Sequence, residues 1–217
     1  MQEKKYTFVA DFAIRNRLAY LSHQETLTLF QRCLLRSGLP VAFSEGFNPR
    51  PRVSIPLARS VGTQSVAERV CAILTSDVET EPLSRLQDHL PEGCDLLAVR
   101  CIEGKCTFHP CIVHYVFHLE GSLSKENLQH LICCQAELTA GGDIQIQRFR
   151  AKKRIYEPID ISSFVEKIDF SGNMIEIVCR ISPEGTVRID ELMQWLAVEP
   201  EQLSEPIKRT EIQWKQN

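Results

Sequence analysis

The sequence predicts an α+β fold of two tandem halves packed together, and two observations indicate it. Apolar residues alternate with polar ones in some segments, as in strands, and recur every three or four residues in others, as in helices. These segments occur twice in the order strand, helix, strand, strand, helix, strand, the split pattern of ferredoxin-like domains. We therefore expect two ferredoxin-like halves, residues 1–105 and 106–217, and no serine- or glycine-rich linker separates them.

The first half begins with a strand over residues 6–14, followed by a turn near Asn16 and a short extended continuation over 18–20. A helix starts next, with Ser22 as its N-cap and Glu25 completing a capping box. Gly38 and Pro40 end this helix. The remaining predicted elements are strands near 41–43, 53–57, 65–75 and 94–102, an irregular loop over 44–52, and a helix near 80–90.

The second half repeats this order in pattern only, without sequence identity to the first. Ser124 is the expected cap of its first helix, and Gly141 and Gly142 interrupt the chain after it. The predicted elements are strands at 111–119, 144–149, 173–181 and 207–214, helices at 124–138 and 188–197, and an irregular connection over 150–170.

The composition is that of a globular protein, with 43% hydrophobic and 24% charged residues among 217. No apolar run approaches the roughly 20 residues that span a bilayer. The first residues lead into a strand pattern rather than a signal peptide, so we expect a cytoplasmic protein without membrane contact. Nine cysteines are an odd number in a chain of this size, and we expect reduced thiols.

Positive charge is concentrated in two segments, although the net charge is only −3. Residues 1–75 carry ten Lys and Arg, eight of them arginine, against five Asp and Glu, and residues 148–156 carry five cations and no carboxylate. Because a local field captures phosphates, two basic segments on an acidic chain indicate a localised anion-binding surface.

The first candidate site combines the helix that begins at Ser22 with the loop after it. Arg32 and Arg36 lie one helical turn apart, and guanidinium groups bind phosphate or carboxylate through two parallel hydrogen bonds. If the loop folds back over the helix, one pocket is lined by His23, Arg32, Arg36, Asn48, Arg50 and Arg52. The alternative is a capped surface helix beside a rigid loop, with solvated arginines.

This region resembles the signature of a known bacterial family. The pattern consists of the Ser22-His23-x-Glu25 helix start, the Arg32 and Arg36 pair, the loop Gly46-Phe47-Asn48-Pro49-x-Pro51 and the downstream Gly62. It is similar to the radical-SAM-linked domain family in its standalone form, and the closing segments 186–192 and 207–210 extend the resemblance over nearly the whole chain. The resemblance adds Ser22, Gly46 and Phe47 to the binding candidates.

The same resemblance implies a context. Domains of this family occur alone or fused behind a radical-SAM enzyme, and their genes tend to lie near RNA-processing and ribosomal genes, so a radical-SAM protein and tRNA or rRNA are the implied partners. The chain lacks the C-x-x-x-C-x-x-C motif of a radical-SAM cluster, a P-loop and a dinucleotide-binding motif, and we expect no cofactor.

The second candidate site is the basic segment itself. Five cations alternate with two aromatic residues, Phe149 and Tyr156, which offers phosphate contacts and base-stacking surfaces. The alternative is a solvated loop balanced by the acidic residues that follow, and the aromatic signature of an RRM is missing. The cations are Arg148, Arg150, Lys152, Lys153 and Arg154.

The cysteines and histidines also bear on function. The spacing of Cys101, Cys106, His109 and Cys111 matches no familiar zinc knuckle, so ordinary thiols are favoured over a metal site. His23 is the one catalytic candidate, as a lone acid or base. Our leading hypothesis is an RNA- or anion-binding accessory module beside a radical-SAM or RNA-modifying partner. Two rival hypotheses are a metal-independent RNA-processing enzyme that uses His23, and a protein-interaction domain.

Overall fold

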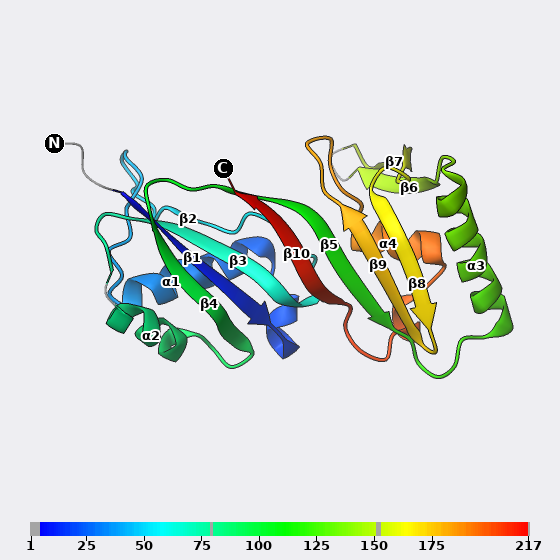
Figure 1. Ribbon diagram of the computed structural model, residues 1–217, viewed down its shortest axis with the longest axis horizontal. Helices are drawn as coiled ribbons and strands as arrows, with labels where there is room; N and C mark the ends of the chain where they lie inside the picture. The colour runs from blue at the N-terminus through cyan, green and yellow to red at the C-terminus, as the bar shows by residue number, and fades with distance from the viewer. Residues whose placement is uncertain (1–4, 79, 151–152, 217) are drawn as a thin grey trace. The chain divides into compact units, whose positions relative to one another are not determined.

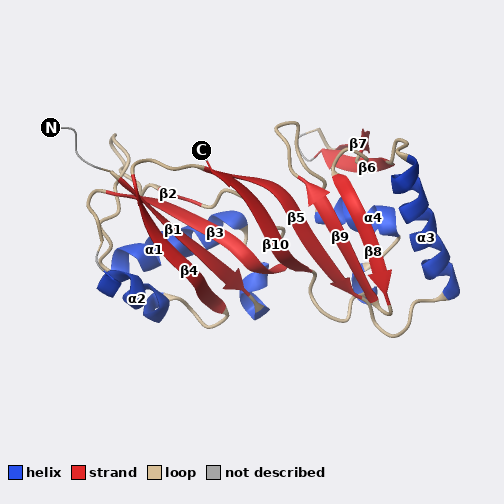
Figure 2. Ribbon diagram, viewed as in Figure 1, coloured by secondary structure: helices blue, strands red, loops and turns tan. Residues whose placement is uncertain are grey.

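The computed structural model describes residues 5–78, 80–150 and 153–216, and it is a mixed α+β protein with four α-helices in that part of the chain (Figures 1 and 2). The chain divides into two compact units, Met1–Pro110 with Trp214–Asn217, and Cys111–Gln213. Within the described residues, none of the helices has both the length and the apolar character needed to cross a membrane.

The first unit is built on an antiparallel sheet whose central strand is β1. This strand pairs with β3 on one side and with β4 on the other, and the short β2 pairs with the outer edge of β3, giving the order β4-β1-β3-β2. The elements of the unit are β1 (Tyr6–Ile14), η1 (Asn16–Tyr20), α1 (His23–Arg36), β2 (Val53–Ser54), β3 (Gln64–Leu74), α2 (Thr80–His89) and β4 (Cys94–Glu103).

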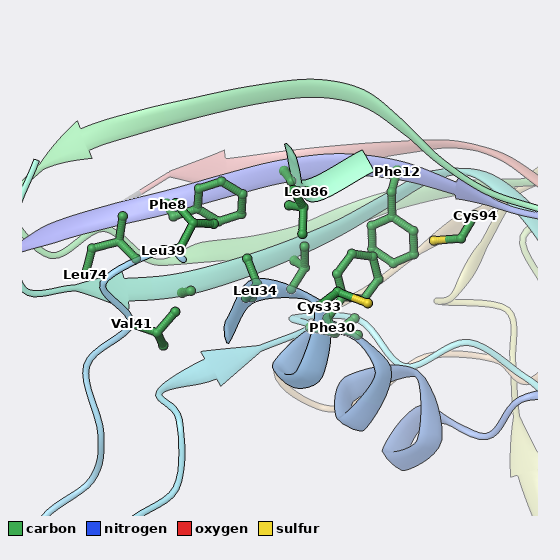
Figure 3. Close-up of a cluster of buried hydrophobic side chains, with 14 of the residues drawn as sticks. Phe8, Phe12, Phe30, Cys33, Leu34, Leu39, Val41, Leu74, Leu86 and Cys94 are labelled. Carbon is green, nitrogen blue, oxygen red and sulfur yellow. The ribbon is translucent and has the colours of Figure 1, made fainter. Parts of the chain in front are cut away.

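The main core of this unit lies between the sheet and its helices (Figure 3). Because side chains alternate along a strand, every second residue of β1 faces this core. Phe12 of β1 and Phe30 of α1 meet with their ring centroids 4.4 Å apart. β1 contributes Phe8, Ala10, Phe12 and Ile14, and α1 contributes Phe30, Cys33 and Leu34, all of them buried.

The opposite face of the first unit's sheet is also covered. Val9 and Cys71 are buried there beneath Phe108 and Trp214. Among these apolar groups, the Arg69 guanidinium donates to both carboxylate oxygens of Asp11, over 2.6 and 2.9 Å. The same guanidinium lies 4.7 Å from the ring centroid of Phe108 and 4.8 Å from that of Trp214. A charged pair thus sits between the sheet and an aromatic cover.

The first unit differs from the prediction after β1 and around β2. The segment expected to continue as a strand over 18–20 is the 3₁₀ helix η1, because Asn16 adopts φ +54° and turns the chain. The strand predicted at 41–43 consists of two isolated bridges, and the strand predicted at 53–57 is limited to the two residues of β2. Pro51 and Pro56 on either side lack an N–H group and limit strand pairing there.

The second unit also has an antiparallel sheet, with the strand order β10-β5-β9-β8. In the pairing of β5 with β9, Tyr115 lies opposite Ile177. Ser124 caps α3, as predicted, and accepts a hydrogen bond from Asn127 N at 3.1 Å. The elements are β5 (Phe108–His118), α3 (Lys125–Ala140), β6 (Gln145–Arg150), β7 (Ile155–Asp160), β8 (Val165–Ser171), β9 (Met174–Arg180), α4 (Ile189–Leu196), η2 (Pro200–Gln202) and β10 (Lys208–Gln216).

The main correction in the second unit concerns residues 144–170. The predicted strand at 144–149 exists as β6, but it pairs with β7 in a separate two-stranded hairpin. The segment expected to be an irregular connection contains β7 and β8, and β8 takes the place beside β9. The alternation of apolar and polar residues in β8 is not visible in the sequence, because a register shift between Val165 and Lys167 interrupts its period of two residues.

All nine cysteines are free, and most are buried. Burial raises the pKa of Cys71 to about 11 and the pKa values of Cys94 and Cys134 to about 12. Because the thiolate is the reacting form, we expect iodoacetamide at pH 8 to label exposed Cys133 first and buried Cys94 only as the protein unfolds. Peptide mass spectrometry over time measures this order. Equal labelling rates in the native protein would contradict the burial described.

Candidate nucleic-acid interface

The start of α1 is a complete capping box, as predicted. The Ser22 hydroxyl accepts from Glu25 N at 3.3 Å, and the Glu25 carboxylate accepts from Ser22 N at 2.8 Å and from the Ser22 hydroxyl at 2.7 Å. The hydrogen bonds from Ser22 hold the pKa of Glu25 below its ordinary value. Because the hydroxyl of Ser22 is engaged with Glu25, its evident role is to cap the helix.

His23 is the first residue of α1 and is half-buried. The chain leading to it is held by Arg59, whose guanidinium is buried and donates to backbone carbonyls. Nη1 donates to Ala19 O at 2.6 Å and to Thr63 O at 2.5 Å, and Nη2 donates to Leu21 O at 3.0 Å. Arg59 therefore fixes the backbone immediately before the helix that carries His23, a role that sequence reasoning missed. The one feature of the sequence that could have indicated this role is the presence of an arginine within the mostly apolar segment 53–61.

Arg32 and Arg36 are exposed on α1, one turn apart. The loop over 44–50 is closed at its base, because Ser44 N donates to Arg50 O at 2.8 Å and Arg50 N donates to the Ser44 hydroxyl at 2.9 Å. Gly46 has φ +125°, a conformation that favours glycine. The candidates Gly46, Phe47, Asn48 and Arg50 are all exposed, and Phe47 is exposed completely.

The structure separates Arg52 from the arginines of α1. The side chain of Val53 packs against the core on the helix side of the sheet. Because neighbouring residues of a strand point to opposite faces, Arg52 and Ser54 point to the other face. Arg32 and Arg36 lie on the helix that covers the helix side. A single pocket that combines Arg52 with these two arginines is therefore not formed.

The basic segment forms part of the β6–β7 hairpin in the second unit, and its first cation has a structural role. The Arg148 guanidinium binds both carboxylate oxygens of Glu191 in α4, through Nε to Oε1 and through Nη2 to Oε2 at 2.8 Å. Nη2 also donates to Thr186 O at 3.0 Å. Glu191 is only 2% exposed, so this ion pair is largely shielded from solvent and anchors the hairpin to α4.

The outer part of the hairpin carries aromatic side chains on one face and Arg150 on the opposite face. Phe149 and Tyr156 lie opposite each other in the strand register, with ring centroids 5.2 Å apart, and are 42% and 69% exposed. Arg150 and Lys153 share the carboxylate of Glu157 at 2.9 and 3.0 Å. The remaining cation of this part is Arg154, exposed at φ +54°, while Lys152 lies outside the described residues.

The sulfur and imidazole groups provide no metal centre in the part of the chain that the structure describes, where no group of three potential ligands occurs. Cys106 is buried in the core beside Phe108. The Cys111 thiol donates to Gln213 O at 3.2 Å, and His118 lies 2.8 Å from a carboxylate oxygen of Glu205. Cys111 and His118 thus each lie against a protein group of the second unit.

These features define an α+β protein with antiparallel sheets and a surface hairpin that is both basic and aromatic. The chain belongs to the family described as "Uncharacterized protein conserved in bacteria (DUF2344)", whose model matches residues 8–191. A comparison with curated proteins gives no significant match.

Among solved structures, similarity is low. The chain is 12% identical to a chain of "Crystal Structure of a Cbf5-Nop10-Gar1 Complex", with a TM-score of 0.42 and coverage of 96% of this chain and 48% of that one. For "Structure of H/ACA RNP bound to a substrate RNA containing 2'-deoxyuridine", the identity is 12%, the TM-score 0.40 and the coverage 96% and 46%. An unknown protein from Galdieria sulphuraria gives 12% identity, a TM-score of 0.26 and coverage of 81% of both chains. The chain spans about half the length of the first two, and similarity at this level assigns neither function nor partner.

Proposed function

We propose that the protein is an RNA-binding accessory module and that the β6–β7 hairpin contacts unpaired RNA. The observation that carries the proposal is the exposed pair Phe149 and Tyr156 on a hairpin that also carries the exposed cations Arg150, Lys153 and Arg154. Bases in single strands and loops stack on aromatic side chains, while nearby cations bind the phosphates. The exposed rings of Phe149 and Tyr156 lie on one face of the hairpin and Arg150 lies on the other, so this one element carries groups for both kinds of contact.

The charge of the hairpin supports binding of a polyanion. Glu157 is the acceptor for Arg150 and Lys153, and these hydrogen bonds hold its pKa below the ordinary value. One carboxylate does not neutralise two cations, and Arg154 adds a third. The net positive charge of this described part attracts phosphates and makes binding dependent on salt.

The base of the hairpin is held in place, which favours binding. Arg148 binds Glu191, and Gln147 N donates to the side chain of Gln194 at 3.2 Å, so two residues of β6 contact α4. An element that is already ordered loses less conformational entropy when its ligand binds. The contacts of β6 with α4 therefore hold the hairpin in place while Phe149 and Tyr156 stay exposed.

We further propose that each unit is a ferredoxin-like half, as the sequence pattern predicts. The strand orders β4-β1-β3-β2 and β10-β5-β9-β8 support it, because each places the first strand of its unit between the third and the fourth. On this proposal the β6–β7 hairpin is an insertion between α3 and β8. Inserted loops often carry function on such scaffolds. In the first unit the sheet face opposite the helices is covered by Phe108 and Trp214, which favours the hairpin over that face as the RNA contact.

The partner in this proposal is a radical-SAM or RNA-modifying protein. It rests on the sequence resemblance around Ser22, His23 and the 44–52 loop. The exposed Arg32, Arg36, Phe47, Asn48 and Arg50 are the residues we propose for that contact or for a second RNA contact.

Fluorescence anisotropy with labelled tRNA and an unstructured RNA oligonucleotide tests RNA binding by the hairpin. We expect Phe149→Ala and Tyr156→Ala each to weaken binding roughly tenfold, since stacking contributes about 1–3 kcal/mol per base. Tyr20→Ala is the matched control, because Tyr20 is an exposed tyrosine of the first unit. Arg154→Gln should reduce the slope of log K against log salt by about one, and Lys125→Gln should leave it unchanged.

Three outcomes separate the rival functions. Equal losses for Tyr20→Ala and Tyr156→Ala, or binding that does not depend on salt, would contradict the hairpin interface. RNA turnover that His23→Ala abolishes, with affinity retained, would identify an enzyme. Absence of RNA binding at low salt would contradict both RNA functions and favour the hypothesis of a protein-interaction domain.

A further inference from the structure

A second surface feature lies in the first unit, and of the RNA-binding candidates considered above it includes only Arg52. It is a cavity of about 270 Å³ between the edge of the sheet at β2 and β3 and the turn that follows β4. Polar residues in its lining include Arg52, Ser54, Lys105 and Thr107, together with Thr7, and Cys71 and Cys106 lie among its apolar residues. We call it the Arg52–Lys105 cavity.

The edge of the sheet fixes one wall of the cavity. Arg52 N donates to Ala42 O at 2.8 Å, and Arg52 O accepts from Ile73 N at 3.0 Å, so the backbone of Arg52 is bound on both sides. Ser54 lies opposite Cys71 in the pairing of β2 with β3. Arg52 and Ser54, two residues apart in an extended segment, therefore present their side chains on the same face.

The turn after β4 forms the other wall and is equally constrained. The buried Thr7 hydroxyl donates to Gly104 O at 2.8 Å and accepts from Cys106 N at 3.0 Å, so one side chain of β1 holds both ends of the turn. Gly104 has φ +89°, and its N–H donates to Lys5 O at 2.7 Å. Lys105 thus projects from a backbone that is already ordered.

The chemistry of the lining residues selects an anion. Arg52 and Lys105 are both cationic, Ser54 and Thr107 have hydroxyl donors, and none of the lining residues is a carboxylate. Over residues 5–78, 80–150 and 153–216, the ion pairs formed by arginine and lysine side chains do not include Arg52 or Lys105. Arg52 and Lys105 are both exposed, so solvent partly screens the attraction and binding depends on ionic strength.

We propose that the Arg52–Lys105 cavity binds a phosphate monoester. A guanidinium group binds two phosphate oxygens at once, an ammonium group and two hydroxyls supply further donors, and a doubly charged monoester uses both cations. The volume is just below the roughly 300–1,000 Å³ of sites for drug-sized ligands, which indicates a small ligand or the end of a larger one. This site does not depend on the hairpin or on the proposed function.

Titration with glycerol phosphate at constant ionic strength, followed by ¹H–¹⁵N NMR, tests the proposal. We expect saturable shifts of the amide signals of Ser54, Lys105 and Thr107. The double variant Arg52→Gln/Lys105→Gln should weaken binding at least tenfold. Arg17→Gln/Lys125→Gln removes the same charge at two exposed positions and should leave the affinity unchanged.

Shifts that grow linearly without saturation, or equal affinity in the two double variants, would overturn the site. Thr107→Val provides a second variant in case the double variant folds poorly, and it should also weaken binding. Unchanged affinity in Thr107→Val combined with unchanged affinity in Lys105→Gln would likewise count against the cavity.

Two sources of the phosphate are distinguished by a second experiment in the Phe149→Ala/Tyr156→Ala background, where binding through the hairpin is weakened. Preference for a 5′-phosphorylated RNA oligonucleotide over the same oligonucleotide with a 5′-hydroxyl group identifies an RNA end. Equal affinity for the two oligonucleotides, with glycerol phosphate still bound, identifies a free small molecule. Both results support the phosphate site.

Discussion

Replacing Arg59 by methionine is expected to lower the free energy of unfolding by about 3 kcal/mol. The buried guanidinium donates to the carbonyls of Ala19, Leu21 and Thr63, and methionine offers no donor to replace it. A buried acceptor left without a partner costs about 1–3 kcal/mol, and more than one is left here. Urea denaturation followed by circular dichroism measures the loss.

Arg36→Met is the control for this substitution, because Arg36 is exposed on α1. We expect it to change the free energy of unfolding by less than about 0.5 kcal/mol. A comparable loss in both variants, or a change in the urea dependence for Arg59→Met alone, would show that the cost does not come from the carbonyls that Arg59 binds.

Glu191→Ala is the second substitution with a large expected effect, also about 3 kcal/mol. It leaves the Arg148 guanidinium, only 11% exposed, without its carboxylate. Removing one partner of a buried ion pair is strongly destabilising, whereas replacing both by apolar residues is often nearly neutral. The double variant Arg148→Met/Glu191→Leu should therefore be more stable than Glu191→Ala. A double variant that is less stable would contradict this account.

The same ion pair predicts a dependence on pH. Burial raises the pKa of Glu191, but hydrogen bonds from Arg148 and from Arg188 N outweigh it, so the pKa in the folded protein lies below its ordinary value near 4.5. A lowered pKa contributes stability above the unfolded value, and this stability is lost as the pH falls through the folded value. The difference in unfolding free energy between the wild type and Glu191→Gln should thus be constant near neutral pH and shrink below about pH 4.5.

Local signals explain what could be predicted from the sequence. The capping box at Ser22 involves residues three apart, and the apolar faces of β1 and α1 follow from regular spacing, so all three are visible in one short window. The basic and aromatic character of the segment after residue 147 is also local, and among its described residues Phe149, Arg150, Lys153, Arg154 and Tyr156 are exposed.

Features that depend on distant residues could not be predicted. Arg59 binds a carbonyl 40 positions away, and Arg148 binds a carboxylate 43 positions away, so neither arginine can be told from a solvated one by its neighbours. The face of Arg52 depends on which edge β2 joins, and the strand β8 contains a register shift that hides its alternation. The hydrogen-bond partner of an arginine and the pairing register of a strand both depend on residues that are distant in the sequence.

The position of Trp214 has a consequence for the order of folding during synthesis. This residue packs over the face of the first unit that holds Val9 and Cys71, and its ring lies against Arg69. Residues 5–110 leave the ribosome before it, and at about 5–20 residues per second roughly 5 to 20 seconds pass before Trp214 is made. Until then that face is covered by Phe108 but not by Trp214, and a chaperone that recognises apolar surfaces has time to bind the part left open.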